Sequence, residues 1–192
     1  MELVLASASP RRRELLTMIG LHFTVTPSDT DEDIPLLAPD EYVQKLALLK
    51  AQAVKKDLKN CCVIGADTIV LLNGEIIGKP KDQSDAVSIL HRLNGNTHTV
   101  YTGLAVLTDD QTQLCYDKTL VTFTAMSNEE ILSYVATGEP MDKAGAYGIQ
   151  GPGGMFIEQI KGCYFTVIGM PLFKLYQMLK QAGIPVFSQG SV

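Results

Sequence analysis

The sequence is short of the residues on which several large classes of catalytic site depend. It contains only three histidines, His22, His91 and His98, which lack metal-ligand spacing and form no Ser-His-Asp arrangement. Its four cysteines include one adjacent pair, Cys61 and Cys62, but no CxxC spacing. We therefore expect buried, reduced thiols and no catalysis by histidine.

Positive charge and long apolar runs are scarce as well. Sixteen Lys and Arg against 21 Asp and Glu give a net charge of -5 over 192 residues, which argues against a general basic surface for nucleic acid and leaves only a local basic site open. No apolar stretch approaches the roughly 18 residues of a transmembrane helix, and the first residues lack the basic start of a signal peptide. With 46% hydrophobic residues, we expect a soluble cytoplasmic protein of one or two compact lobes.

Hydrophobic periodicity predicts an α/β protein. Expected strands cover residues 3–6, 23–25, 63–72, 75–77, 99–107, 114–124, 155–160 and 163–168; expected helices cover 10–19, 40–56, 82–93, 127–137 and 171–182. Asn73-Gly74 predicts a hairpin turn, and residues 138–154, rich in Gly and Pro, predict a long loop. Because hairpin-linked strands alternate with isolated helices, the sheet is expected to be mixed.

The first helix begins with an unusual run of positive charge. Ser9 suits the N-cap and Pro10 suits the first helical position, but Arg11, Arg12 and Arg13 lie where the helix dipole disfavours cations. An anion at this helix N-terminus would compensate, because free backbone N–H groups and arginine side chains both suit phosphate. The alternative is that the arginines point into solvent or pair with acidic loops.

A second feature is one carboxylate, Asp67, within the apolar run Val63–Leu72. A desolvated, unpaired charge is costly, so we expect Asp67 at a strand end or over a cleft. With Glu32 from the acidic loop Thr30–Asp33, it could hold a hard divalent cation together with phosphate oxygens. The structural alternative is an Asp that caps a turn or pairs with a Lys.

A third feature is the glycine-rich segment Asp142–Gly151, whose backbone can approach a ligand closely. Within it, Gln150 offers a donor and an acceptor to the edge of a nucleobase. The segment matches neither the dinucleotide-binding nor the P-loop pattern. Lys50 and Lys79 could reach the same ligand, although most lysines on such segments are solvated. Three anion-compatible elements beside acidic residues point to a nucleoside triphosphate with a metal.

Four segments carry a resemblance to a known family: Leu5–Arg12, Gly65–Val70, Gly78–Pro80 and Asp142–Gly151. In this order they resemble the signature segments of the Maf family of nucleoside triphosphate pyrophosphatases. The resemblance runs from about Leu3 to Leu179 and identifies residues 1–192 as a single Maf-like domain.

Membership implies an α/β fold shared with inosine triphosphate pyrophosphatases, with a mixed twisted sheet, flanking helices and two lobes around a cleft. It also implies a cytoplasmic homodimer that uses Mg²⁺ or Mn²⁺ to hydrolyse a nucleoside triphosphate to the monophosphate and diphosphate. The branch that acts on dTTP and UTP has Arg, Thr and Gln at three selectivity positions, here Arg11, Thr68 and Gln150. The 7-methyl-GTP branch has Trp, Gln and Glu there, so the resemblance favours dTTP and UTP.

The resemblance also implies roles for individual residues. Asp67 corresponds to the proton acceptor for the attacking water and to a metal ligand, and Glu32 to the second metal carboxylate. The implied phosphate contacts are Ser7, Arg12, Lys50 and Lys79.

A hypothesis from another class is a non-catalytic regulator of cell division and septum formation, because the family is linked to these processes. Such a protein would bind nucleotide or nucleic acid without turnover. It would need the arginines and glycines, but it would have no need for a carboxylate such as Asp67 at a reacting centre.

Overall fold

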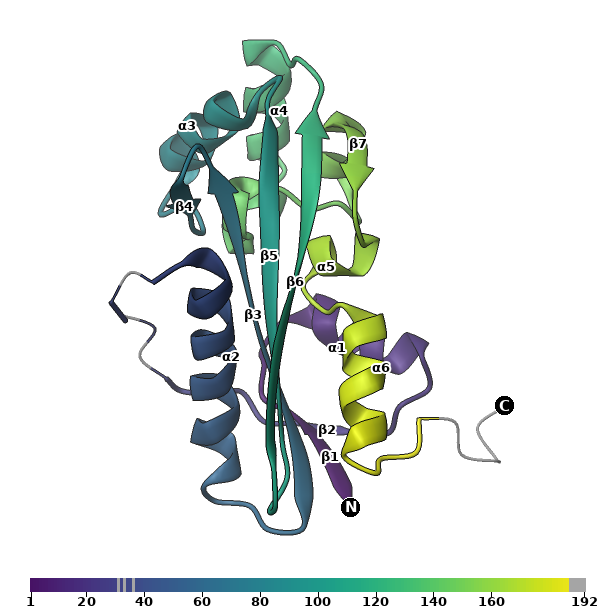
Figure 1. The fold of residues 1–192 in the computed structure, drawn as a ribbon. Helices are drawn as coiled ribbons and strands as arrows, with labels where there is room; N and C mark the ends of the chain where they lie inside the picture. The colour runs from purple at the N-terminus through teal and green to yellow at the C-terminus, as the bar shows by residue number, and fades with distance from the viewer. Residues whose placement is uncertain (31, 33, 36, 187–192) are drawn as a thin grey trace. The chain divides into compact units, whose positions relative to one another are not determined.

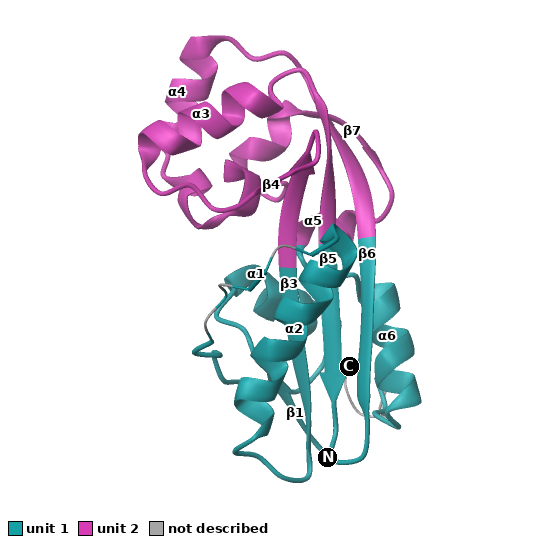
Figure 2. Ribbon diagram, turned by 60° about the vertical axis from the view of Figure 1, so that its left-hand side comes forward, with its two compact units in different colours: residues 1–67, 102–117, 169–192 teal, residues 68–101, 118–168 magenta. Residues whose placement is uncertain are grey.

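The computed structural model of the chain describes residues 1–30, 32, 34–35 and 37–186. Their contacts divide the chain into two compact units (Figure 2). Unit 1 consists of residues 1–67, 102–117 and the chain from Gly169 onward, and unit 2 consists of residues 68–101 and 118–168.

One sheet contains every described strand. The strands are β1 (Glu2–Leu5), β2 (Thr24–Val25), β3 (Cys61–Leu72), β4 (Glu75–Ile77), β5 (Thr97–Leu107), β6 (Thr112–Phe123) and β7 (Ile157–Lys161). Their order is β2-β1-β3-β5-β6-β7, with β4 paired to β3. β1 runs parallel to β2 and β3, whereas β4 is antiparallel to β3 and β7 is antiparallel to β6. The predicted mixed sheet is confirmed.

The helices, labelled in Figure 1, lie largely where the hydrophobic periodicity of the sequence predicts them. They are α1 (Pro10–Met18), α2 (Pro39–Lys55), α3 (Gln83–Leu93), α4 (Asn128–Ala136), α5 (Tyr164–Ile168) and α6 (Leu172–Gln181). Short 3-10 helices cover Glu139–Asp142, Ala144–Ala146 and Pro152–Phe156. The segment 138–154, predicted as an irregular loop, is therefore partly regular, because single 3-10 turns need no hydrophobic period to form.

In unit 1, α2 covers one face of the sheet and α6 covers the other (Figure 1). α2 has Asp40 and Glu41 in its first turn and Lys55 in its last, which complements the helix dipole. Its buried side chains join a core of small and aliphatic residues: Val4, Ala6, Ala47, Ala51, Val54, Cys61, Val63, Ala105 and Leu107.

In unit 2, α3 and α4 pack against one another over a separate core. The predicted capping box is present: Ser127 Oγ accepts from the Glu130 N–H at 3.2 Å, and Glu130 Oε2 accepts from the Ser127 N–H at 2.7 Å. The predicted hairpin between β3 and β4 is also present. Asn73 and Gly74 have φ values of 51° and 85°, as a tight two-residue turn requires.

One predicted hairpin is wrong. β7 is a strand, but Tyr164–Ile168 forms helix α5 instead of a second strand. Thr119 Oγ1 donates to the Cys163 carbonyl at 3.0 Å and accepts from the Cys163 N–H at 2.9 Å. Both backbone groups that a strand partner would need at Cys163 are thus taken by a side chain. This tertiary contact overrides the β propensity of the segment.

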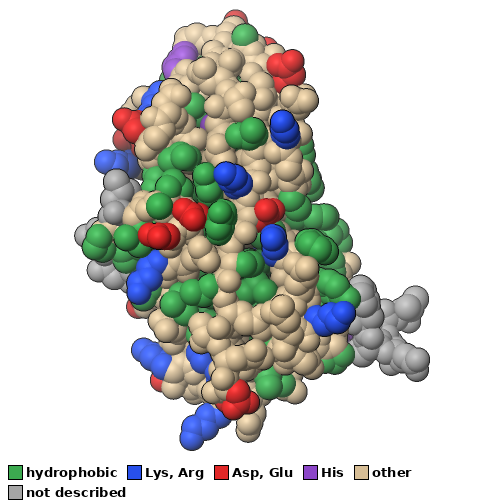
Figure 3. Space-filling view, viewed as in Figure 1, with side chains coloured by type: hydrophobic (Ala, Val, Ile, Leu, Met, Phe, Trp, Pro, Cys, Tyr) green, Lys and Arg blue, Asp and Glu red, His purple; other side chains and the backbone are tan. Residues whose placement is uncertain are grey.

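The surface follows the composition, but the thiols follow it only in part: Cys61 and Cys62 are buried as predicted, whereas Cys115 and Cys163 are half-buried. On the face in Figure 3, acidic and basic side chains are interspersed. No helix among the described residues has the length and apolar character to cross a membrane. All four cysteines are free, and burial raises the pKa of Cys62 to about 12, so its thiol stays protonated at neutral pH.

Candidate active site

The basic segment at the start of α1 is partly buried. Arg12 is only 9% exposed and Ser7 only 7%. Arg12 Nε donates to the Gly169 carbonyl at 2.9 Å, and its Nη1 donates to Ser7 Oγ at 3.2 Å. Ser9 occupies the N-cap, as predicted, but its side chain makes no capping hydrogen bond; its backbone N–H donates to Ser7 Oγ instead. Arg13 is exposed, so the neighbouring arginines have different environments.

The electrostatics of Arg12 reflect this burial. Desolvation lowers the pKa of Arg12 from its ordinary value, and the nearby charge of Arg11 acts in the same direction. The carboxylates of Asp67 and Glu32 raise the pKa and thus oppose that shift. The sequence-predicted basic and acidic residues therefore lie within electrostatic range of each other in unit 1.

A lysine connects the two predicted metal carboxylates. Lys50 Nζ lies 2.6 Å from Asp67 Oδ1 and 3.0 Å from Glu32 Oε1. Asp67 is 7% exposed and lies within β3, which corrects the expectation of a strand end. The Lys50 ammonium supplies the opposite charge that makes a carboxylate tolerable there, so the alternative of an Asp paired with a Lys is realised.

Two glycines bring α2 close to the strands that face it. A Cβ on Gly65 of β3 would lie 2.2 Å from the Ala47 carbonyl oxygen, and a Cβ on Gly103 of β5 would lie 2.3 Å from that of Val43. Any larger residue would push the helix backbone away. This close approach brings the ammonium of Lys50 within reach of β3. Neither glycine contact was predicted, although glycine inside a strand is a recognisable signal for close backbone packing.

The carboxylate pair suits a hard divalent cation. Asp67 and Glu32 already converge on one positive charge, and Mg²⁺ is usually held by one or two carboxylates plus substrate phosphates. Among the described residues, no group of three or more His, Cys, Asp and Glu side chains stands together, and Asp31 and Asp33 of the same loop lie outside the described residues. The donor set therefore fits a cation that completes its shell with phosphate and water.

The remaining predicted residues belong to unit 2. Thr68, next in sequence to Asp67, is half-buried, whereas Lys79 and Gln150 are exposed. A backbone hydrogen bond joins the segments that carry Lys79 and Gln150: the Gly145 N–H donates to the Gly78 carbonyl at 3.0 Å. The third and fourth signature segments thus lie together in unit 2, with the end of the second, residues 68–70.

Gly145 explains the close packing of these segments. A Cβ on Gly145 would lie 2.8 Å from Val70 Cγ2, and its φ of 74° lies in the left-handed region that favours glycine. Ala146 beside it has a φ of 57°, which is uncommon for a residue with a side chain. The segment is thus held in a strained conformation by its surroundings.

Tyr147, which follows Ala146, belongs to a buried aromatic cluster with His98 and Phe123 that the sequence did not predict. His98 Nε2 lies 2.8 Å from the hydroxyl of Tyr147, and both rings pack edge-on against Phe123. Burial lowers the pKa of His98 to about 4 and raises that of Tyr147. Both side chains are therefore neutral at pH 7. No spacing in the sequence marks this contact between residues 49 positions apart.

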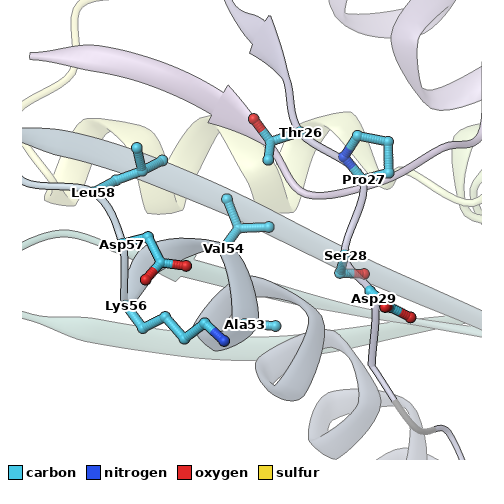
Figure 4. Close-up of a pocket in the computed structure, with 9 residues that line it drawn as sticks. All are labelled: Thr26, Pro27, Ser28, Asp29, Ala53, Val54, Lys56, Asp57 and Leu58. Atoms are coloured by element: carbon cyan, nitrogen blue, oxygen red, sulfur yellow. The ribbon is translucent and has the colours of Figure 1, made fainter.

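A pocket of about 290 Å³ lies elsewhere in unit 1 (Figure 4). Its lining comes from the segment after β2 and from the end of α2: Thr26, Pro27, Ser28, Asp29, Ala53, Val54, Lys56, Asp57 and Leu58. None of these is a sequence-predicted site residue. The buried charges of unit 1 mark the candidate active site better than this hollow does.

Comparison with known proteins agrees with this chemistry. A profile of the Maf family, described as Maf-like protein, matches residues 2–182. The dTTP/UTP pyrophosphatase of Symbiobacterium thermophilum is 47% identical over 191 residues, covering 99% of this chain and 98% of that protein. The dTTP/UTP pyrophosphatase of Pelotomaculum thermopropionicum is 49% identical over 188 residues, covering 96% and 98%.

Among solved structures, the Staphylococcus aureus Ham1 protein has a TM-score of 0.54 and 18% identity, with coverage of 95% of this chain and 100% of that one. At this identity the likeness concerns the fold alone, and it confirms the predicted α/β class. The family profile and the sequence relatives span nearly the whole chain, so the chain belongs to the Maf family.

Proposed function

We propose that this chain hydrolyses dTTP and UTP, with Mg²⁺ or Mn²⁺, to the nucleoside monophosphate and inorganic diphosphate. The observation that carries the proposal is that Asp67 and Glu32 both contact the Lys50 ammonium, at 2.6 and 3.0 Å. Both carboxylates also lie within electrostatic range of buried Arg12. The relatives named dTTP/UTP pyrophosphatase support the same activity.

Asp67 is the proton acceptor in this proposal. As the carboxylate of an ion pair, it can take a proton from a water molecule whose oxygen forms the new bond to phosphorus. The bond between the attacked phosphorus and the oxygen that bridges the α- and β-phosphates breaks, and its electron pair leaves with that oxygen. A general base of this kind contributes about 10²–10⁴-fold to the rate.

The cations of the site would hold the triphosphate. Arg12 is already oriented by Ser7 and the Gly169 carbonyl, so little side-chain freedom is lost when it binds phosphate. Ser7, Lys50 and Lys79 supply the further phosphate contacts in this proposal. An ammonium has three donors, and two of those on Lys50 already face Asp67 and Glu32.

Asp67 and Glu32 would hold the divalent cation, which when bound offsets the negative charge of the triphosphate. The same two carboxylates share one positive charge in the structure, the Lys50 ammonium, which supports their assignment as cation ligands. Lys50 itself would contact the phosphates.

Gln150 would choose the base, with Arg11 and Thr68 as the other selectivity residues. Its amide can donate to a ring carbonyl and accept from the imide N–H that uracil and thymine share. Cytosine lacks that N–H, so one hydrogen bond would fail. We expect kcat/KM for CTP and for purine triphosphates to be at least about tenfold below that for UTP and dTTP.

The proposal further treats residues 1–192 as one Maf-like domain that acts in the cytoplasm as a homodimer. Free cysteines with a protonated, buried thiol suit a reducing compartment. Sedimentation of the purified protein at micromolar concentration tests the dimer, because a monomer at all concentrations would remove that part.

The test of the function is product analysis. UTP and dTTP with Mg²⁺ should give equal amounts of the nucleoside monophosphate and inorganic diphosphate. Chelation of the metal should stop the reaction. Release of inorganic phosphate with a nucleoside diphosphate would assign a different hydrolase. Tight binding of UTP without turnover would favour the regulator.

A further inference from the structure

Glu139 lies under the turn that carries Gln150. Its Oε2 accepts from the Gly153 N–H at 3.0 Å. A Cβ on Gly151 would lie only 1.8 Å from its Oε1, so the carboxylate occupies the place where a side chain of Gly151 would begin. One carboxylate thus contacts the turn on both sides of Pro152.

Tyr134 supports the same turn from α4. Its hydroxyl accepts from the Gly148 N–H at 3.2 Å, and it hydrogen-bonds Glu139. A Cβ on Gly153 would lie 2.4 Å from this hydroxyl. Burial raises the pKa of Tyr134, and so does the hydrogen bond to Glu139, which keeps the hydroxyl available as a donor to the carboxylate.

Lys143 hydrogen-bonds the backbone carbonyl of Glu139 and the side chain of Asp142, and not the Glu139 carboxylate. Lys143 Nζ donates to the backbone carbonyl of Glu139 and to Asp142 Oδ1, each at 2.6 Å. The carboxylate therefore receives donors from Gly153 and Tyr134 while Lys143 fixes the backbone behind it. Hydrogen bonds from uncharged donors to a carboxylate are short-range and directional, which suits orientation more than charge compensation.

We infer that Glu139 is a positioning residue for base selection: it fixes the turn Gln150–Gly153 and thereby the direction in which the Gln150 amide meets the base. The inference rests on the proposed function, because it assigns a use to Gln150. A Cβ at 151 would displace the Glu139 carboxylate from the turn, and a Cβ at 153 would overlap the Tyr134 hydroxyl and the backbone of Gly148. The absence of side chains at 151 and 153 thus leaves room for the contacts with Glu139 and Tyr134.

The first experiment compares kcat/KM for UTP and CTP in Glu139→Ala, with Glu158→Ala as the matched control from the exposed part of β7. Loss of the turn contacts should lower the UTP-over-CTP ratio by about fivefold, mainly through KM for UTP, because misdirected hydrogen bonds no longer discriminate. Glu139→Gln keeps one oxygen acceptor and should retain most of the ratio. An equal loss for UTP and CTP in Glu139→Ala would overturn the inference.

A double-mutant cycle tests the close contact itself. Gly151→Ala should lower the UTP-over-CTP ratio, because its Cβ would overlap Glu139 Oε1. The variant with both Gly151→Ala and Glu139→Ala should be no worse than Glu139→Ala alone, because the overlap is gone. Fully additive losses would show that Gly151 acts independently of Glu139 and would contradict the inference.

Amide hydrogen exchange separates this inference from the proposed function. In Glu139→Ala without nucleotide, a peptide covering residues 148–154 should exchange about fivefold faster or more, whereas Glu158→Ala should match the wild type. Unchanged exchange overturns the clamp whatever the enzyme does. Faster exchange in a protein whose wild type hydrolyses neither UTP nor dTTP would uphold the clamp and remove the proposed function.

Discussion

In unit 1, ion pairs between side chains hold a charged cluster, Lys50 with Asp67 and Glu32. In unit 2, hydrogen bonds from the backbone to the side chains of Tyr134 and Glu139 hold the turn that carries Gln150, and we call this set the turn network. In unit 1, Lys50 bridges Asp67 and Glu32 at 2.6 and 3.0 Å. In unit 2, the hydroxyl of Tyr134 accepts from the Gly148 N–H at 3.2 Å. The two arrangements suit different tasks.

An ion pair can exchange its partners. A metal ion can replace an ammonium between two carboxylates, and a phosphate can replace a carboxylate beside an ammonium, because the sign of the charge is the same. Hydrogen bonds that hold a backbone instead fix a direction, which recognition of a base edge requires. Under the proposed function, we therefore expect the charged cluster to be rearranged by the substrate and the turn network to stay fixed.

The largest effect should come from Asp67→Asn. The change is isosteric, but it removes the proposed proton acceptor and a proposed metal ligand, so we expect turnover of UTP to fall by about 10²–10⁴-fold or more. Circular dichroism and UTP binding check that the fold and most of the affinity remain. Turnover within a few-fold of the wild type would remove Asp67 from the mechanism.

Lys50→Met should be the most destabilising change in the charged cluster. It leaves Asp67, 7% exposed, without its ammonium partner, and breaking such a buried pair costs about 3 kcal/mol or more. Urea unfolding measures the loss, and millimolar Mg²⁺ should restore part of it in the variant.

The control for that variant lies on the same helix. Lys55 pairs with Asp109, whose side chain is 39% exposed, so Lys55→Met should cost only about 1 kcal/mol or less. If Mg²⁺ shifts the stability of Lys50→Met no more than that of Lys55→Met, the carboxylate pair is not a cation site.

Arg12→Ala should destabilise the free protein by about 2 kcal/mol, because it leaves the Gly169 carbonyl and Ser7 Oγ without a charged donor. The helix dipole alone predicts the opposite sign, and that prediction should hold for exposed Arg13→Ala, with a gain of about 0.3–1 kcal/mol. Thermal unfolding of both variants without nucleotide makes the comparison. Equal changes in the two would show that the buried hydrogen bonds of Arg12 contribute nothing.

Acid should destabilise unit 2 through His98, whose Nε2 lies 2.8 Å from the Tyr147 hydroxyl. Its pKa falls from an ordinary 6.5 to about 4 on burial, so between these values the unfolded chain binds more protons than the folded chain. The stability from neutral His98 is therefore complete above pH 6.5 and is lost as the pH falls toward 4.

Between pH 7 and pH 5 this loss should be between about 1 and 2 kcal/mol, at 1.36 kcal/mol per pH unit. His98→Gln cannot titrate and can still hydrogen-bond Tyr147, so urea unfolding should show a flatter pH dependence by that amount. Exposed His91→Gln is the matched control. A wild-type slope in His98→Gln would mean that other groups govern acid stability.

Much of the fold follows from local sequence signals. The capping box at Ser127 and the Asn73-Gly74 turn predicted what the structure contains. The apolar period predicted helix α2 but not the face that it buries, which consists of Val43, Leu46, Ala47, Ala51 and Val54. Tyr164–Ile168 forms a helix because Thr119, 44 positions before Cys163, takes the backbone groups of Cys163. A contact so distant in sequence leaves no periodic trace.

The candidate site was predictable as a list of residues but not as an arrangement. Spacing and the family resemblance identified Asp67, Glu32, Arg12 and Lys50, and their catalytic and binding roles stay predictions. That Lys50 bridges the two carboxylates depends on how closely α2 packs on β3, which Gly65 permits but does not specify. The place of Glu139 under the Gln150 turn likewise depends on three-dimensional packing.

The most direct test of this division of tasks is equilibrium binding to a protein that cannot turn over. With Mg²⁺, Asp67→Asn should still bind UTP at least about tenfold more tightly than CTP, because the proposal assigns base selection to Gln150 and the turn network and not to Asp67. Adding Gln150→Glu should abolish that preference. Loss of the preference in Asp67→Asn alone, or its survival in the double variant, would contradict the account.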